Sequence, residues 1–413
     1  MKPDHPIRII GAGMSGLVAA VYLHQNGFPV TIHDTARHIG GRLETTQKNG
    51  WALDRGFQVL LTEYPLTKKY LDYGDLDLIY FRPGAKVFSS GKSYCIGNPL
   101  QDLSLAWPTL KYPWATLSDK WKLARLTQGL LATDLPEIFS RAERTTENYL
   151  IEKGFSSPMI QSFFRPFFGG IFLEKKLTTS SRMFEFVLKM FSSGQAAVPA
   201  NGIQQMANQL ARQIPSNSIH LGQKVTNKEP QSISLDDGTK LEASAVLCAH
   251  AQPESSLQKW NRCMNIYFSS SDPQVITVPM IGLIADENSP VTNFHYLNKV
   301  PGGPSSDEQI VSVTLLPPHN NYSQEQGIQE AQQELAKHAG LRDLKLLAVF
   351  EIDQALPVHQ EVKLEASPAE IRDQSGIYYC GDALTAPSLN MAMGTGEKAA
   401  QMIMDDLRST AKN

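Results

Sequence analysis

The chain has 413 residues, of which 42% are hydrophobic and 19% charged, so we expect two domains or one large interleaved pair. A formal net charge of −3 without any basic run argues against a nucleic-acid partner. The four cysteines lie far apart, which argues against a metal site or a disulfide framework and favours the cytoplasm. No apolar run reaches the ~18 residues that cross a bilayer. Peripheral contact with a membrane stays open.

The first predicted unit is a strand, a glycine turn and a helix. Ile7–Ile10 has the pattern of a buried strand, and the helical spacing of Leu17–Gln25 follows it. Between them Gly11, Gly13 and Gly16 form G-x-G-x-x-G. Such glycines allow a tight turn, a close approach of backbone to a pyrophosphate, and packing of the helix on the strand. The unit therefore predicts a dinucleotide site.

A second predicted strand, Val30–His33, ends in Asp34. This acid follows Gly11 by 34 − 11 = 23 residues, close to the spacing of a carboxylate that accepts hydrogen bonds from an adenosine ribose. A ribose 2′-phosphate would be repelled there. At this point the pattern leaves NAD and FAD open.

From Leu76 to Ala196 the pattern is helical, with many aromatic residues and no strong strand signal. We expect helices at Lys120–Leu131, Thr146–Lys153, Pro158–Phe168 and Arg182–Phe191. Residues 197–250 return to an α/β pattern, with a helix, hairpin strands that turn at Asp236–Gly238, and a buried strand in "ASAVLCAH".

The next hundred residues predict a mostly antiparallel sheet. Its extended runs are Met264–Ser269, Val275–Ile284, Thr292–Leu297, Ile310–Leu316 and Leu346–Ile352, with one helix at Gln324–Ala339. Finally, "GIYYCGD" predicts a strand that ends in Asp382, and a glycine-started helix follows it. The chain thus leaves the dinucleotide domain and re-enters it twice.

Several linked motifs resemble the superfamily of flavin-containing amine oxidases, phytoene desaturases and protoporphyrinogen oxidases. In chain order they are "GAGMSGL" (11–17), Asp34 with "IGGRLET" (39–45), "DRGFQV" (54–59), "VPANGIQQMANQLA" (198–211), "LGQKV" (221–225) and "CGDALTAPSLNMAMGTGEKAA" (380–400). The resemblance runs from end to end and implies FAD as the cofactor. Because Cys380 is not in a recognisable flavin-linking sequence, we expect FAD to be non-covalent.

The fold class that follows is α/β, α+β overall, with a Rossmann-type FAD-binding domain interleaved with a substrate domain of antiparallel sheet and helices. The expected domains are residues 1–75, 197–257 and 372–413 for FAD, and 76–196 and 258–371 for the substrate.

The resemblance also implies cofactor contacts, residue by residue. Pyrophosphate, ribose and phosphate contacts fall on Gly11, Ala12, Gly13, Ser15, Gly16, Asp34, Gly41 and Arg42. Flavin-ring, adenine and ribityl contacts fall on Gly56, Phe57, Gln58, Val225, Gly381 and Asp382. Helix amides at Met393, Gly394 and Thr395 would face the pyrimidine edge of the ring, where negative charge gathers on reduction.

The chain departs from the superfamily pattern in two places. Ala36 stands where an arginine is usual, with Arg37 one position later, so one phosphate contact is in doubt. Near the C-terminal motif Met391 and Met393 stand in place of a paired-aromatic cage, which makes simple amines less favoured substrates.

No catalytic residue is identified. Gln58, Met391 and Met393 are candidates beside the flavin, and Arg165 is a candidate on the substrate side, although a carboxylate within the protein is its expected partner. His295 and His359 are interpreted as structural.

The stretch 157–191 is dense in Phe and Met, which favours a bulky, mostly apolar small-molecule substrate. We predict its dehydrogenation by hydride transfer to flavin, in a desaturase-like or oxidase-like reaction. Three alternatives remain: a flavin-dependent polyene isomerase without net redox change, a flavin amine oxidase, and a flavoprotein kept for binding.

Overall fold

The computed structural model describes residues 4–250, 259–297, 309–318, 322–359 and 361–410. The predicted domain boundary at 257 and 258 lies outside these ranges. Within them, no helix is both long and apolar enough to span a bilayer.

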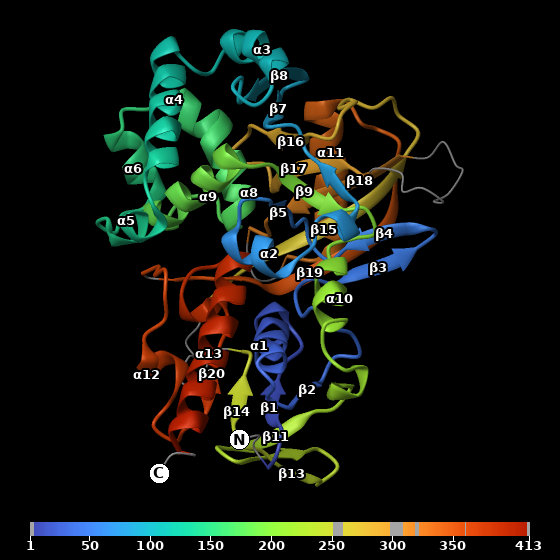
Figure 1. Cartoon of the computed structure of the whole chain (residues 1–413). Helices are drawn as coiled ribbons and strands as arrows, with labels where there is room; N and C mark the ends of the chain where they lie inside the picture. The colour runs from blue at the N-terminus through green and yellow to red at the C-terminus, as the bar shows by residue number, and fades with distance from the viewer. Residues whose placement is uncertain (1–3, 251–258, 298–308, 319–321, 360, 411–413) are drawn as a thin grey trace.

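A five-stranded parallel sheet lies at the end of the molecule that holds both chain termini (Figure 1). In spatial order its strands are β10 (Ile219–Leu221), β2 (Val30–Asp34), β1 (Ile7–Ile10), β14 (Val246–Cys248) and β20 (Tyr378–Tyr379). The central β1 pairs in parallel with β2 and β14. The chain leaves this sheet and re-enters it twice, and the predicted strands are confirmed.

Two long helices, α1 (Met14–Gln25) and α13 (Leu389–Thr410), pack on each other beside this sheet, next to the shorter α10 (Gln205–Ala211). A Cβ atom on Gly396 would lie 2.1 Å from the carbonyl oxygen of Ser15, so the two helix backbones touch at this point. The N-terminal and C-terminal ends of the chain are thereby joined in one core, which includes Leu17 and Ile403.

A small antiparallel sheet connects β10 to β14. It consists of β11 (Val225–Glu229), β12 (Ser232–Leu235) and β13 (Lys240–Glu242). The turn between the last two strands contains Asp236 and Gly238, as the sequence predicts.

A seven-stranded sheet forms the second layer. Its strands, in spatial order, are β19 (Leu344–Pro357), β15 (Trp260–Ser270), β18 (Gln309–Leu315), β17 (Val291–Tyr296), β16 (Ile281–Ile284), β7 (Gly84–Ser89) and β8 (Lys92–Gly97). All pairs are antiparallel except β16 with β7. Helix α11 (Gln324–Ala339) packs on this sheet and begins with a capping box of Ser323 and Gln326. The predicted mostly antiparallel sheet is confirmed.

The expectation of a purely helical stretch from residue 76 is wrong for its first part. Strand β6 (Leu78–Tyr80) joins β5 (Leu60–Leu61) and β9 (Ala196–Pro199), and the hairpin β7–β8 extends the large sheet. A local signal for this hairpin was present. Ser90 and Gly91 have φ of 48° and 76°, the left-handed pair of a two-residue hairpin turn. Another hairpin, β3 (Thr45–Lys48) with β4 (Trp51–Asp54), lies at the right of Figure 1.

Helices fill the rest of the stretch and form a separate layer (Figure 1). They are α3 (Ala106–Lys111), α4 (Leu117–Ala132), α5 (Leu135–Ser140), α6 (Thr146–Glu152), α7 (Ser157–Met159), α8 (Arg165–Phe172) and α9 (Ser181–Ser193). A π-helical turn, Ile160–Phe164, joins α7 to α8. Short helices α2 (Pro65–Tyr70) and α12 (Pro368–Ile371) lie elsewhere. The four helices predicted here are confirmed within a few residues.

Candidate functional site

A large, continuous cavity of about 1660 Å³ reaches all three layers of the fold. One end is lined by the glycine turn and β2, the middle by strands of the seven-stranded sheet, and the other end by α4, α8 and α9. Pockets for one drug-sized ligand are roughly 300–1,000 Å³. This cavity therefore has room for a dinucleotide together with a second molecule.

The glycine turn has the geometry that its spacing predicts. A Cβ atom on Gly16 would lie 2.1 Å from the carbonyl oxygen of Gly11, so α1 can pack on β1 only with glycine there. Gly13 lines the cavity, and a Cβ atom on it would meet no protein atom within 4 Å. Space is thus open beside exposed backbone at the N-terminus of a helix, which suits a pyrophosphate.

Asp34 stands at the end of β2 and lines the same end of the cavity. Its carboxylate accepts hydrogen bonds from the backbone N–H of Ala12 at 2.6 Å and of Ala36 at 2.8 Å. A carboxylate has about four lone-pair sites, so acceptor capacity remains for ribose hydroxyls. The side chain therefore fixes the glycine turn and can still accept from a ligand.

Arg42 and Asp382 are 340 positions apart in the chain and form an ion pair at 2.5 Å. Arg42 also donates to the carbonyl oxygen of Ala355 at 3.2 Å, and its guanidinium lies 5.6 Å from the ring centroid of Trp260. All four residues line the cavity. Gly41 lies directly against the glycine turn, since a Cβ atom on it would be 3.2 Å from the Cα of Gly13. The predicted phosphate-binding residues thus meet at one place.

Gly56, Phe57 and Gln58 also line the cavity. Gln58 donates to the carbonyl oxygen of Arg42 at 2.8 Å, which connects this loop to the Arg42–Asp382 pair. The Phe57 ring lies 4.2 Å from the ring of His295. Burial lowers the pKa of His295 to about 3, so its imidazole is neutral. This histidine does not line the cavity and packs behind Phe57.

The C-terminal motif differs from expectation in where its helix begins. Helix α13 begins at Leu389, because the side chain of Ser388 accepts from the backbone N–H of Met391 at 3.2 Å. Met393, Gly394 and Thr395 therefore lie in its second turn and do not line the cavity, so placing the helix start at these residues was wrong. Leu389 and Ala392 line it instead.

Thr395 acts on the cavity through Gly381. Its hydroxyl accepts from the backbone N–H of Gly381 at 2.9 Å and donates to the carbonyl oxygen of Ala392 at 3.0 Å. Gly381 lines the cavity with φ of +135°, and a Cβ atom on it would meet nothing within 4 Å. A second stretch of open backbone thus lies beside Asp382 and lines the same cavity as the glycine turn.

The remaining predicted residues divide between the cavity and its surroundings. Ser15 and Val225 line it, whereas Ala12 and Gly16 lie behind it. Met391 and Met393 are buried in the hydrophobic cores. Cys380 is fully buried and does not line the cavity, and burial raises the pKa of its thiol to about 12.

Arg165 has the internal partner that the sequence predicts. It forms an ion pair with Glu147 at 2.5 Å and donates to the carbonyl oxygen of Lys175 at 2.6 Å. It does not line the cavity, so the structure gives it a part in holding α6 near α8 rather than a contact with a ligand.

The helical end of the cavity is apolar. Its lining includes Leu123, Met159, Phe163, Phe167, Phe168, Ile171, Met183, Val187, Leu188 and Phe191. The rings of Phe163 and Phe167 are stacked, 5.5 Å apart. Of the lining residues between 98 and 196, a range that the structure describes throughout, Lys120 alone carries charge. Its ammonium donates to the carbonyl oxygens of Leu110 and Tyr112 at 2.8 and 3.2 Å.

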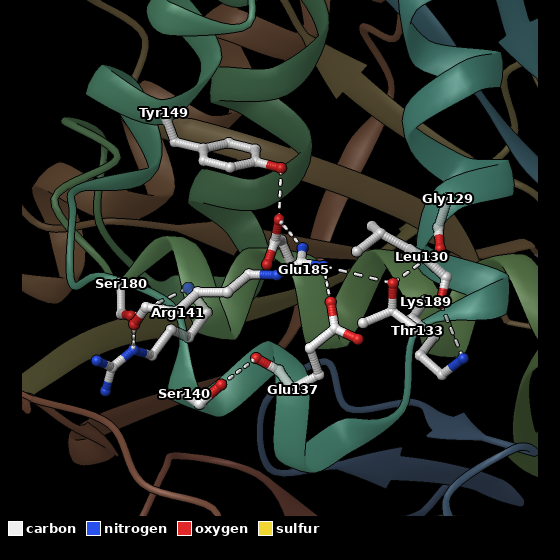
Figure 2. Close-up of polar contacts among 11 residues, drawn as sticks. Gly129, Leu130, Thr133, Glu137, Ser140, Arg141, Tyr149, Ser180, Glu185 and Lys189 are labelled. Carbon is white, nitrogen blue, oxygen red and sulfur yellow. Dashed lines mark hydrogen bonds and ion pairs between the residues drawn. The ribbon is translucent and has the colours of Figure 1, made fainter.

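Helix α9 is held from behind by buried polar contacts, which Figure 2 shows. The carboxylate of Glu185, only 2% exposed, accepts from Arg141 at 2.7 Å and from the hydroxyl of Tyr149. One turn later Lys189 donates to the carbonyl oxygen of Leu130 at 2.9 Å. Since the cavity-lining side chains stand on the same helix, these contacts fix the wall of the apolar end.

Sequence reasoning missed two parts of the lining. Trp260 and the 351–356 segment of β19 have no motif, and they reach the cavity only because the large sheet brings them there. The stripe Lys120, Leu123 and Thr127 on α4 has helical spacing, but that spacing does not say which partner the stripe faces.

Comparison with known proteins gives the family. The family described as flavin containing amine oxidoreductase matches residues 14–404. A 4,4′-diapolycopen-4-al dehydrogenase of Metabacillus indicus is 31% identical over 100 residues, 23% of this chain and 20% of that protein. The curated relatives are matched over less than a third of their own length.

Solved structures show the same fold over the whole chain. A putative protoporphyrinogen oxidase from Exiguobacterium sp. 255-15 has a TM-score of 0.69 at 17% identity and covers 98% of this chain and 99% of its own. The CLA-producing fatty acid isomerase from P. acnes also has a TM-score of 0.69, at 16% identity, and covers 97% and 99%. Together with the family match, this establishes that the chain belongs to the flavin-containing amine oxidoreductases, whose cofactor is FAD.

Proposed function

We propose that the protein is an FAD-dependent dehydrogenase or oxidase that acts on a bulky, mostly apolar small molecule. The observation that carries the proposal is the continuous cavity, with open backbone at one end and an apolar lining of helical side chains at the other. Bound FAD supplies the two-electron chemistry by accepting a hydride. The protein has to hold the cofactor, orient the substrate and exclude water.

At the cofactor end, the proposed contacts follow the geometry above. Gly11, Gly13 and Gly41 lie where backbone can meet the pyrophosphate, and Asp34 has free acceptor sites for the ribose. The guanidinium of Arg42 has five N–H donors, so it can donate to a phosphate as well as to Asp382. The division of the chain into a cofactor domain and a substrate domain belongs to this proposal.

At the substrate end, the lining favours an apolar molecule over a simple amine. An ammonium group needs a carboxylate or an aromatic face, and Lys120, the single charge among the lining residues between 98 and 196, would repel it. Phe57 and Phe81 also line the cavity, but their rings lie 5.9 Å apart at 59° and pack against each other. They leave no slot between parallel faces for an amine.

The proposed reaction depends on position more than on acid–base chemistry. His295 and His359 have pKa values lowered by burial, and neither lines the cavity, so neither is placed to exchange a proton with a molecule in it. Stacked phenylalanines and the aliphatic side chains of α9 would hold the reacting bond and keep water out.

The test is anaerobic mixing of the flavin-loaded protein with polyenes, long-chain fatty acids and simple amines, followed by flavin absorbance. We expect an apolar compound to bleach the flavin and simple amines to leave it oxidised. Bleaching by amines alone would assign the protein to the amine oxidases.

The runner-up, a flavin-dependent isomerase, has one observation in its favour, because the fold is shared with a fatty acid isomerase. It predicts isomerised product only when the flavin is reduced beforehand, without bleaching by the substrate. Neither bleaching nor isomerisation would favour a flavoprotein kept for binding.

A further inference from the structure

An apolar face with unusually high exposure covers the outer side of α3, α4 and the loop before them, the part of the helical layer at the top of Figure 1. It consists of Leu100 (86% exposed), Leu103 (82%), Trp107 (63%), Leu117 (69%) and Trp121 (61%). Scattered exposed apolar residues are ordinary, but five strongly exposed ones between Leu100 and Trp121, two of them tryptophans, are typical of an interaction surface. Below, these five residues are called the apolar face.

The apolar face adjoins the apolar end of the cavity. Leu100, Gln101 and Ala124 are exposed and also line the cavity, so they form part of its rim. The side-chain amide of Gln101 donates to the carbonyl oxygens of Phe191 at 3.2 Å and Gly194 at 2.9 Å, which holds this rim against α9. A molecule that enters here passes from the apolar face directly to the stacked phenylalanines.

The stretch of chain that carries the apolar face has a positive net charge, although the whole chain is slightly acidic. Residues 100–125 contain two acids, and both are engaged within the fold: Asp102 accepts from Arg82, and Asp119 accepts from Ser156. The same stretch contains four basic residues, of which Lys120 lines the cavity and Lys111, Lys122 and Arg125 lie outside its lining. Its outer surface is therefore complementary to an anionic partner.

The tryptophans and the cations are paired. The ammonium of Lys111 lies 4.7 Å from the ring centroid of Trp107, and the guanidinium of Arg125 lies 5.3 Å from that of Trp121. Tryptophan beside lysine or arginine is the combination found where proteins meet the headgroup layer of a bilayer, because the ring enters the acyl boundary and the cation stays with phosphate.

We propose that the apolar face docks the protein on the surface of an anionic phospholipid bilayer, with the cavity rim against the membrane. The inference rests on the proposed function, because an apolar substrate collects in the bilayer and would enter the cavity without crossing water. A second copy of the chain fits less well, since a two-fold contact would bring each basic cluster against its own copy.

The experiment is co-sedimentation of the full-length, flavin-loaded protein with phosphatidylcholine vesicles, with and without phosphatidylglycerol. The test variant is the double substitution Trp107→Glu with Trp121→Glu, at positions outside the cavity lining. The control is Leu346→Glu, which alters a 49% exposed apolar residue on β19, away from the helical layer. Flavin content and sedimentation velocity of each protein are measured beside binding.

We expect the protein to bind vesicles that contain phosphatidylglycerol, to bind phosphatidylcholine weakly, and to be released by salt. The double variant should lose on the order of a hundredfold in partition, because burial of each tryptophan is worth roughly tenfold. The control should bind like the unchanged protein.

Three results would overturn the proposal: no binding to either vesicle, equal binding by the double variant, or a concentration-dependent dimer that the double substitution abolishes without any vesicle binding. Failure of the proposed function is distinguishable from these results. If no apolar compound in detergent micelles bleaches the flavin but vesicle binding survives, the reaction is wrong and the docking surface stands.

Discussion

At the glycine end of the cavity the wall is made of backbone, whereas at the helical end it is made of side chains. Gly13 and Gly381 present open backbone to the cavity, and Asp34 holds the turn through backbone N–H groups. The helical end depends on Phe163, Phe167 and their neighbours, which are positioned by polar contacts behind α9.

This difference predicts how substitutions at each end of the cavity affect the protein. A backbone wall recognises a pyrophosphate by shape and dipole, so it tolerates few substitutions and binds one kind of cofactor. A wall of side chains can be reshaped by single substitutions without disturbing the sheet beneath it. We therefore expect changes at the glycine end to remove FAD, and changes at the helical end to alter stability or substrate binding with FAD in place.

The largest expected effect is at Gly13. In Gly13→Val the side chain would fill the space beside the backbone, so FAD retention should be abolished. Gly129→Val is the matched control, since Gly129 lies on α4 with nothing near its Cβ position and outside the cavity lining. Flavin absorbance after gel filtration checks both, and retention of flavin by Gly13→Val would contradict the proposed pyrophosphate site.

The next effect concerns the contacts behind α9. Glu185→Ala would leave Arg141 and Tyr149 without their shared acceptor. Because Arg141 is 35% exposed and keeps Glu137 as a partner, we expect a loss of about 2 kcal/mol, the range for a hydrogen bond to a charged group. Glu137→Ala, which removes a largely exposed partner of Arg141, should cost less than about 1 kcal/mol. Chemical unfolding measures both free energies. Equal losses would show that the buried contact does not hold the helical layer.

A pH effect follows from His295. Burial lowers its pKa from 6.5 to about 3, so between these values the unfolded chain takes up a proton that the folded chain does not. The contribution of neutral His295 to the free energy of unfolding is thus fully present above pH 6.5. Between pH 6.5 and about 3 it falls with falling pH, by roughly 1.4 kcal/mol per pH unit. His295→Gln should remove this part of the acid sensitivity, whereas the same change at exposed His5 is the control. If the free energy of unfolding fell equally steeply with falling pH in His295→Gln and in the unchanged protein, His295 would not be a source of the acid sensitivity.

The smallest effect is at the apolar wall. Phe167→Ala should raise the KM for an apolar substrate roughly tenfold, because one stacked ring of the lining is lost, and leave the flavin spectrum unchanged. Phe350→Ala alters a half-buried ring on β19 outside the lining and serves as control. An unchanged KM in Phe167→Ala would remove the helical end from the substrate site.

The same contrast separates what the sequence predicts from what it does not. The parallel strands, the glycine turn, Asp34 and Arg42 are visible locally, because short-range spacing dictates backbone geometry there. The partnership of Arg42 with Asp382 is not visible, since the fold alone brings together positions 340 apart. The mistaken start of α13 has a local cause, because Ser388 caps the helix before the glycines that suggested its beginning.

The sequence predicted the helices of the helical layer, but it did not predict that they line one end of the cavity. Amphipathic spacing predicts which sides of α4 and α9 are buried. On α9, however, two buried side chains have different surroundings: Glu185 contacts Arg141 behind the helix, and Val187 lines the cavity. Which buried side faces a ligand depends on packing between helices. The hairpin β7–β8 was missed although Ser90 and Gly91 mark its turn, because the flanking segments have no strong strand pattern and β7 gains its second neighbour, β16, from a distant part of the chain.

The flavin-to-protein ratio of three purified chains tests the two-ended cavity most directly. We predict about one flavin per chain in the unchanged protein and in Phe167→Ala, and none in Gly13→Val. Loss of flavin from Phe167→Ala together with its retention in Gly13→Val would reverse the two ends and contradict the account.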